Sequence, residues 1–190
     1  MKQLFSFLLF LSFFVSFSQN PTMLVSACTE PTVVTDYTYF VDIEGKFDKF
    51  VGTWKYTNGS QLLTFKISKV TQQYFPEERI FRDYLVGDYS YSSDGGNSYV
   101  VNSILSPINP DPNVHPMYSP CVEEDSVRFI FKDIALNKGY CYATFTFLPG
   151  STTQLQVQIR NPAEIPGRMA GEPAYNYDFI TPTDIIVIKQ

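Results

Sequence analysis

The chain has 190 residues, a formal net charge of −5 at pH 7 and a hydrophobic fraction of 44%. A mildly acidic chain lacks the basic stripe that a phosphate backbone requires, so we expect no nucleic-acid binding. The length suits one domain with a buried core.

The first 18 residues are typical of a secretory signal peptide. Lys2 gives a positive start, residues 4–17 form an apolar run, and Ser16 and Ser18 are small residues at the cleavage site. The run is too short to span a membrane, and no later run is long enough. We therefore predict an exported protein, periplasmic or extracellular. Lipid attachment at Cys28 is an alternative, because residues 25–28 resemble a lipobox.

Residues 19–49 are predicted to form an N-terminal arm ahead of a single domain at residues 50–190. Pro21 and Pro31 interrupt the arm, and a β-branched patch lies at residues 32–35. This composition favours an extended, irregular chain. Residues 42–49 can form one short helical turn before the first strand of the domain.

The stretch 50–70 gives the strongest structural signal in the chain. Asn58 and Gly59 form the dipeptide most typical of a type I′ turn, whose two central residues both need a positive φ. Pairing the flanking strands across this turn puts one set of side chains on a common face, because side chains alternate with a period of two. That face comprises Phe50, Gly52, Trp54, Leu63, Phe65 and Ile67.

Strand-like segments continue along the chain. They lie at residues 80–91, 98–105, 127–132, 140–148, 154–159 and 184–189. Residues 106–121 contain five prolines and are predicted to be a loop that cannot be a central strand. Glycines within strands, Gly52 and Gly87, indicate a bend or a close backbone approach. About eight strands joined mostly by short turns predict an all-β, antiparallel up-and-down barrel, because closure removes exposed edges.

Two resemblances support this fold. Gly52 and Trp54 after a short turn resemble the Gly-x-Trp start of lipocalins and the wider calycin group. The chain also resembles an uncharacterised family of small secreted Bacteroidetes proteins, in its signal peptide, in DKFVGTWKYTNG (residues 48–59) and in DYLVGDYSY (residues 83–91). The first resemblance implies a lipocalin-like barrel, with Trp54 buried near its closed end. The second implies no activity, since that family has none assigned.

Three cysteines follow the signal peptide. In an up-and-down barrel, the loop 106–121 and the N-terminal arm both lie at the closed end, whereas Cys141 follows a turn at the open end. A disulfide needs Cα atoms about 4.4–6.8 Å apart. We therefore predict a Cys28–Cys121 disulfide and a buried thiol at Cys141.

Candidate catalytic and metal-binding groups are few. His115 is the only histidine. Asn109, Asp111 and Asn113 alternate with it along one loop, but the EF-hand pattern is not met, and a polar loop stiffened by prolines explains them better. Cys121 lies six residues from His115, which suits a nucleophile with its base, yet an exported cysteine is more often in a disulfide. We expect no catalytic residue, metal or cofactor.

Ligand-binding candidates come from two aromatic or apolar groups. Tyr89, Tyr91, Tyr140 and Tyr142 could line a pocket, although core packing explains them equally well. Ile165, Met169 and Tyr175 are apolar side chains in residues 161–177, a long stretch that could cover the open end as a lid.

Two functions remain open at this point. One is a structural or protein-interaction module whose barrel is filled with side chains. The other is a carrier of a small apolar ligand, and an interior pocket of roughly several hundred Å³ would favour it. The partner is accordingly a protein or a small apolar molecule, and the sequence does not name either.

Overall fold

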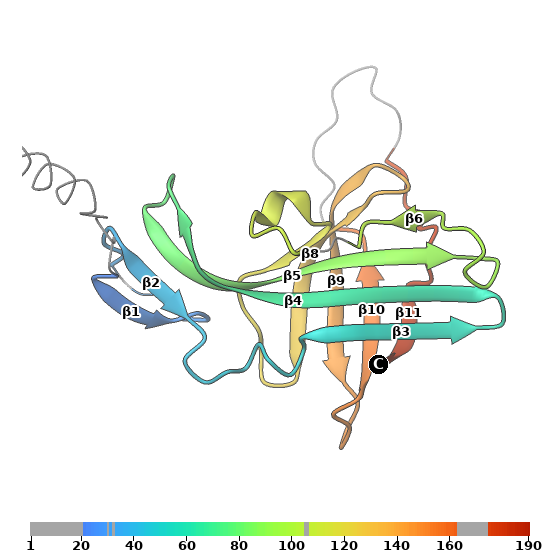
Figure 1. Ribbon diagram of the computed structural model, residues 1–190, viewed down its shortest axis with the longest axis horizontal. Coiled ribbons are helices and arrows are strands. Elements are labelled where there is room, and N and C mark those ends of the chain that lie inside the picture. Colours follow the sequence, from blue (N-terminus) through green and yellow to red (C-terminus); the bar gives the residue numbers. More distant parts are fainter. Residues whose placement is uncertain (1–20, 30, 32, 105–106, 163–174) are drawn as a thin grey trace, which may run out of the picture.

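The computed structural model describes residues 21–29, 31, 33–104, 107–162 and 175–190, so the predicted signal peptide lies outside it (Figure 1). The described residues form one sheet of eleven strands and one short 3-10 helix, η2 (Pro112–Val114). None of the helices in this part of the chain has the length and apolarity needed to cross a bilayer.

Eight strands close into an antiparallel barrel, which confirms the predicted lipocalin-like fold. Consecutive strands pair with one another, β11 returns to β3, and β7 joins β5 to β8. The barrel strands are β3 (Gly52–Asn58), β4 (Gln61–Phe75), β5 (Ile80–Ser92), β7 (Met117–Ser119), β8 (Ser126–Asp133), β9 (Lys138–Phe147), β10 (Gln154–Arg160) and β11 (Asp184–Lys189).

The β3–β4 hairpin has the predicted faces but a different turn. Asn58 pairs with Gln61, so the turn consists of Gly59 and Ser60 instead of Asn58 and Gly59. Only Gly59 has a positive φ (57°), as in a type II′ turn with glycine first. The strand pairing shifts by two residues, so that Trp54 pairs with Phe65. Because side chains alternate with a period of two, this even shift keeps every side chain on its predicted face. The buried members of that face are Phe50, Trp54, Leu63, Phe65 and Ile67.

Strand β7 corrects the prediction for residues 106–121. Its three residues pair with β5 on one side and β8 on the other, and they close the barrel. The prediction was wrong because Pro116 and Pro120 flank the paired residues and do not interrupt them. The predicted strand at 98–105 contributes only β6 (Val101–Asn102), which pairs with β5 outside the closed ring.

Gly87 allows β7 to approach β5 closely. It pairs with Met117, and a Cβ atom added at Gly87 would lie 3.0 Å from the Met117 Cε. Gly52 plays the same role at the β3–β11 seam, where an added Cβ would lie 2.9 Å from the Lys189 Cε. At both glycines, a neighbouring side chain occupies the space that a Cβ atom would take.

Aromatic rings fill the middle of the barrel. Strands β4 and β9 lie four places apart in the ring of eight and therefore face each other across the interior. The ring centroids of Phe65 on β4 and Phe145 on β9 are nevertheless only 5.1 Å apart. Phe129 lies 5.4 Å from Phe145, and Phe131 lies 5.2 Å from Tyr89. All five side chains are fully buried.

Trp54 is fully buried, as predicted. Its Nε1 donates a hydrogen bond to the Phe50 carbonyl oxygen at 2.8 Å. The preceding segment, residues 43–50, forms successive turns and packs Phe47 and Phe50 into the same core. These turns stand where one helical turn was expected. The Asp42 carboxylate accepts hydrogen bonds from the backbone nitrogens of Lys46 and Phe47, which fixes the start of the turns.

The β4–β5 hairpin continues beyond the barrel wall and carries the N-terminal arm (Figure 1). Strand β2 (Thr38–Val41) pairs with β5 in parallel, and β1 (Met23–Ser26) adds a further parallel strand. A bulge between Val70 and Gln73 marks where β4 leaves the barrel. The arm therefore contains short strands instead of being wholly irregular.

A disulfide joins Cys28 in the arm to Cys121, and the Cα atoms lie 5.0 Å apart. The predicted pairing is therefore present. Cys141 keeps its thiol and is buried, also as predicted. Because lipidation would use the same sulfur in a thioether, the disulfide argues against the alternative of a lipid at Cys28.

Candidate functional site

The loop before β7 is pinned to the outer face of β5 by the buried His115. Its Nδ1 lies 3.0 Å from the Asp88 Oδ1, and its Nε2 lies 2.8 Å from the Asn109 carbonyl oxygen. Since a carbonyl oxygen only accepts, Nε2 donates to it. Both ring nitrogens are thus engaged inside the protein. Cys121 is in the disulfide, so the His115–Cys121 pair considered from the sequence does not form a nucleophile with its base.

The polar side chains of the same loop form hydrogen bonds within the loop. Asp111 caps η2, and its Oδ1 accepts hydrogen bonds from the Asn113 backbone nitrogen (2.9 Å) and Nδ2 (3.0 Å). Within the described ranges, no three His, Cys, Asp or Glu side chains are grouped so that they could hold a metal ion. The interpretation of Asn109, Asp111 and Asn113 as a structured polar loop fits these contacts.

The predicted ligand-binding tyrosines are divided between different places. Tyr89 and Tyr91 point into the barrel and are buried. Tyr142 lies on the outer face, with the Arg128 guanidinium carbon 4.0 Å from its ring centroid. Tyr175 lies at the barrel end where β9 begins, with its hydroxyl 3.0 Å from the Asn161 Oδ1 and 3.8 Å from the Cys141 Sγ. The side chain of Tyr140 lies outside the described part of the structure, as do Ile165 and Met169.

The end of the barrel near Cys141 is polar. The Lys138 Nζ donates hydrogen bonds to the carbonyl oxygens of Asp178 (2.6 Å) and Asn176 (3.2 Å), and it lies 3.6 Å from the Phe179 ring centroid. The Asp133 Oδ2 is buried and has no hydrogen-bond partner among the described residues. Asn176, Asp178 and Phe179 therefore lie beside Lys138 at this end, whereas most of the predicted lid lies outside the described residues.

Two side chains at this end, Cys141 and Tyr175, have raised pKa values. Burial raises the pKa of the Cys141 thiol. Burial, with a hydrogen bond to Cys141, raises the pKa of Tyr175 to about 12. A thiol with a raised pKa carries little thiolate and is a weak nucleophile.

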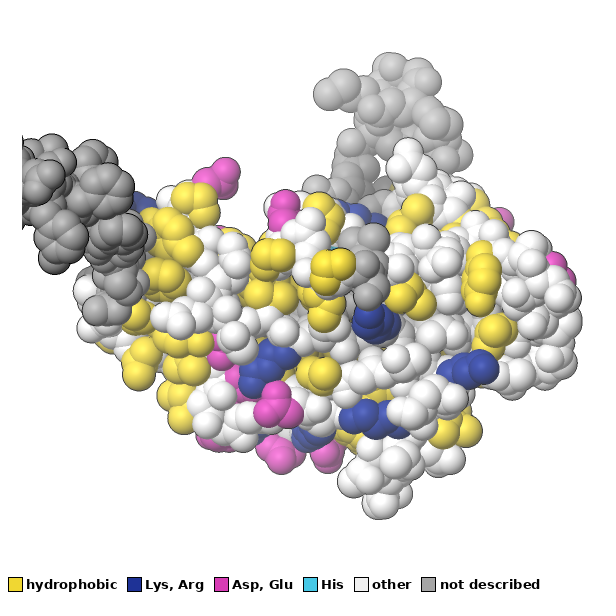
Figure 2. Space-filling model, in the orientation of Figure 1, with side chains coloured by type: hydrophobic (Ala, Val, Ile, Leu, Met, Phe, Trp, Pro, Cys, Tyr) yellow, Lys and Arg dark blue, Asp and Glu magenta, His cyan; other side chains and the backbone are white. Residues whose placement is uncertain are grey.

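A groove lies between the projecting hairpin and the loop that carries η2. Two adjoining hollows of about 420 and 500 Å³ form it, and they share Phe75, Glu78, Pro112 and Asn113. We call it the hairpin groove. Figure 2 shows the surface hollowed between the hairpin and the body of the molecule. Its other lining residues are Gln73, Tyr74, Pro76, Glu77, Asp111, His115, Pro116, Tyr118, Ile130 and Lys132.

A row of packed aromatic rings runs beneath the hairpin groove. The ring centroid of Tyr84 lies 5.7 Å from that of Phe75 and 5.3 Å from that of Tyr118. The Tyr84 hydroxyl donates a hydrogen bond to the Pro110 carbonyl oxygen. Because Tyr84 is fully buried and contacts both walls, it ties the hairpin to the loop.

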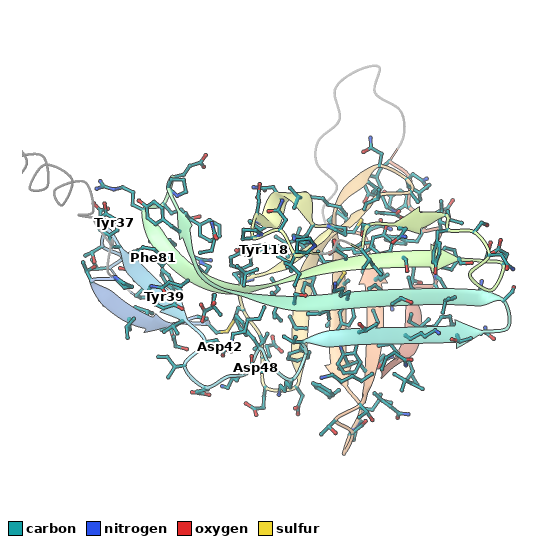
Figure 3. All side chains as sticks on the ribbon, viewed as in Figure 1. Tyr37, Tyr39, Asp42, Asp48, Phe81 and Tyr118 are labelled. Atoms are coloured by element: carbon teal, nitrogen blue, oxygen red, sulfur yellow. A yellow bond between two sulfur atoms is a disulfide. The ribbon has the colours of Figure 1, made fainter. Side chains whose placement is uncertain are left out.

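Polar contacts hold the hairpin wall in place. The buried Asp83 carboxylate accepts hydrogen bonds from the Tyr39 hydroxyl (2.6 Å) and from the backbone nitrogens of Gln72 (2.9 Å) and Asp42 (2.9 Å). The Lys69 Nζ lies 2.8 Å from the Asp42 Oδ2. Figure 3 shows Tyr39, Asp42 and Phe81 at this junction of arm and hairpin. The groove is therefore preformed.

Sequence reasoning missed the hairpin groove, because its walls come from segments about thirty-five residues apart that only the fold brings together. The Tyr74–Phe75–Pro76 run lies next to Glu77 and Glu78 at the tip of the hairpin. Three bulky apolar side chains in an exposed hairpin tip were the available signal, since such clusters often mark a contact surface.

Comparison with known proteins places the chain in a family without assigning an activity. No curated protein and no solved structure matches it significantly. A family model does match, and the match covers residues 1–190. The chain therefore belongs to a family of unknown function, DUF6705.

Proposed function

We propose that this protein is an exported, non-catalytic interaction module that uses its barrel as a solid scaffold and recognises its partner outside the barrel. The contact between Phe65 and Phe145 carries this proposal, because 5.1 Å between ring centroids from opposite walls leaves no room for a ligand at that level. The hairpin groove is the preformed hollow on the outer surface.

Carriage of a small apolar ligand is less well supported. A ligand in the middle of the barrel would have to displace Phe65, Phe145 and the rings packed on them, all of which are fully buried. Opening such a space in a close-packed core is costly. The end near Cys141 is lined by polar groups, including Asp133 and Lys138, which suit an apolar ligand poorly.

The contacts of the chemically active side chains support a non-catalytic role. Both nitrogens of His115 are occupied, Cys121 is in a disulfide, and burial raises the pKa of the Cys141 thiol. The disulfide is compatible with export, since such bonds persist in oxidising compartments.

Titration calorimetry with the intact mature protein tests the scaffold. We expect no heat of binding from long-chain fatty acids, phospholipids, haem or quinones. Phe145→Ala serves as a positive control, because it should open a dry apolar cavity that binds benzene. Stoichiometric binding of any of these ligands by the wild-type protein, or an apolar molecule retained on purification, would overturn the proposal.

A further inference from the structure

We propose that the hairpin groove binds a basic, extended segment of a partner protein, with an arginine or lysine side chain held between the Phe75 ring and the carboxylates beside it. This inference rests on the interaction module proposed above and adds the chemistry of its partner.

The charges of the groove favour a cation. The hollow at the hairpin tip is lined by three carboxylates, Glu77, Glu78 and Asp111, and by no lysine or arginine. Arg82 lies 3.7 Å from Glu78 and offsets one of these charges. Glu77 makes no ion pair with any other described residue. Charges of one sign in a hollow with apolar walls raise the local concentration of the opposite charge.

Lys132 offsets a second of the three carboxylate charges, which leaves the groove with a net negative charge. It lines only the second hollow, and its Nζ donates a hydrogen bond to the Asn113 carbonyl oxygen at 3.2 Å. Asp111 accepts hydrogen bonds from Asn113 through Oδ1, whereas no contact to another described residue engages its Oδ2. Carboxylate oxygens at the hairpin tip therefore remain available to a ligand.

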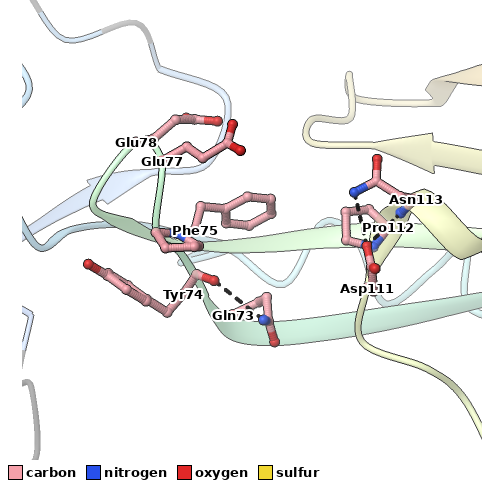
Figure 4. A pocket seen from close by; sticks show the side chains of 9 residues that line it. Gln73, Tyr74, Phe75, Glu77, Glu78, Asp111, Pro112 and Asn113 are labelled. Carbon is pink, nitrogen blue, oxygen red and sulfur yellow. Dashed lines mark hydrogen bonds between the residues drawn. The ribbon is translucent and has the colours of Figure 1, made fainter.

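The rings make the groove more selective than a patch of acidic residues. Figure 4 shows the Phe75 ring projecting into the gap towards Pro112, with Glu77 and Glu78 on the same side of the gap. Tyr74 and Phe75 are both half-buried and line the hollow. A guanidinium group can stack on an aromatic face while it pairs with a carboxylate, and a neutral side chain can do only part of this.

The shape of the groove favours an extended segment. The two hollows adjoin each other from the hairpin tip to Ile130 and Lys132 on β8. Pro76, Pro112 and Pro116 line the groove, and proline fixes the backbone dihedral φ. The disulfide and the Asp83 contacts hold one wall, and the contact of His115 with Asp88 holds the other. A preformed groove avoids the ordering cost that a mobile loop would add to binding.

Fluorescence anisotropy with labelled peptides tests the charge requirement on the full mature chain with its disulfide intact. The probe is a capped nonapeptide in which arginine alternates with glycine, and its control carries citrulline at every arginine. Citrulline has nearly the same shape but no charge. We expect the citrulline peptide to bind at least about tenfold more weakly, and the arginine peptide to lose affinity as salt is raised. Equal binding of both peptides, or binding of neither, would overturn the inference.

Three variants test the location. Glu77→Gln should weaken the arginine peptide about threefold, as expected for one exposed ion pair. Phe75→Leu, which keeps apolar volume but removes the ring, should weaken it about fivefold. Glu124→Gln removes one exposed carboxylate elsewhere and should change nothing beyond the general effect of net charge. Thermal midpoints of all three variants verify that they are folded.

Two outcomes separate this inference from the proposal on which it rests. If a neutral glucose pentamer binds and Phe75→Leu abolishes that binding, the groove is a glycan site and the basic partner is rejected. If neither the arginine peptide nor any lipid binds, the basic partner is rejected while the solid scaffold stands. Lipid binding inside the barrel would instead reject the scaffold itself.

Discussion

The barrel and the projecting hairpin belong to the same two long strands but are stabilised in different ways. Inside the barrel, β4 and β5 contribute fully buried apolar side chains such as Phe65 and Leu85 to one core. Beyond the bulge at Val70, the same strands leave that core. A two-stranded hairpin is only marginally stable by itself in water, so its projecting part needs further support.

Covalent and polar contacts supply that support. The Cys28–Cys121 disulfide, the three hydrogen bonds to Asp83 and the Lys69–Asp42 ion pair all lie where the arm meets the hairpin. These contacts act together with the aromatic rings beneath the groove, which lie outside the apolar core of the barrel. Changes in the barrel should therefore unfold the whole molecule, whereas changes at the junction should loosen the arm and the groove first.

The largest effect is expected from Trp54→Ala in the barrel. Removing this fully buried ring leaves a cavity and should lower the free energy of unfolding by about 3–5 kcal/mol. Urea denaturation followed by circular dichroism measures the change. Ile188→Ala on the neighbouring strand β11 is the control, because that side chain is 49% exposed and should alter stability little. A Trp54→Ala midpoint equal to that of wild type would show that the barrel core does not dominate stability.

The second effect concerns the disulfide. The double variant Cys28→Ser, Cys121→Ser should lose about 2–4 kcal/mol of stability, because the unfolded chain regains the freedom of a long closed loop. Hydrogen exchange should speed up first in β1 and β2, with β9 and β10 still protected. Wild-type protein after mild reduction is the matched control. Uniform loss of protection across the barrel would contradict the separation between the two regions.

The third effect concerns Asp83. The Asp83 carboxylate accepts hydrogen bonds from three donors. In Asp83→Asn the amide NH2 group must face one of these donors, so that hydrogen bond is lost and the free energy of unfolding should fall by about 2 kcal/mol. Asp36→Asn is the control, because Asp36 is exposed and pairs only with Arg79. Chemical denaturation compares the two variants. We expect the loss to be accompanied by faster exchange of the β2 amides, and equal stability of the two variants would refute the role assigned to Asp83.

Much of the fold was predictable because the signals were local. The alternation along residues 50–70 placed Trp54, Phe65 and Ile67 on one buried face, and a turn misplaced by one residue, which shifts the strand pairing by two, preserved that face. The geometry of an up-and-down barrel also separated Cys141 from the two bonded cysteines. Strand β7 was not predictable in this way, since its three residues gain strand structure only from the neighbours β5 and β8.

The candidate site was harder to predict than the fold. The sequence left the tyrosines open between a ligand pocket and core packing, and the structure divides them between the core (Tyr89, Tyr91) and the surface (Tyr142) according to strand register and loop cover. The hairpin groove depends on how far β4 extends past the barrel and on where the proline-rich loop crosses β5. Both are tertiary features, and no short-range pattern encodes them.

The smallest effect is expected from Asp94, an exposed polar contact at the turn after β5. Its carboxylate accepts hydrogen bonds from the Ser98 hydroxyl and backbone nitrogen and from the Ser92 hydroxyl, and these bonds hold its pKa well below the ordinary range. A carboxyl group whose pKa is lowered by folding stabilises the folded state at any pH above its pKa in the unfolded chain, about 3.9. This contribution is lost as the pH falls below that value towards the pKa of the folded state. The stability difference between wild type and Asp94→Asn should therefore be constant near neutral pH and shrink below about pH 4. Urea midpoints measured for both proteins from pH 7 downwards test this, at low salt because exposed charges are screened. A stability difference that stays constant into the acid range would show that the turn does not depend on the ionised Asp94 carboxylate.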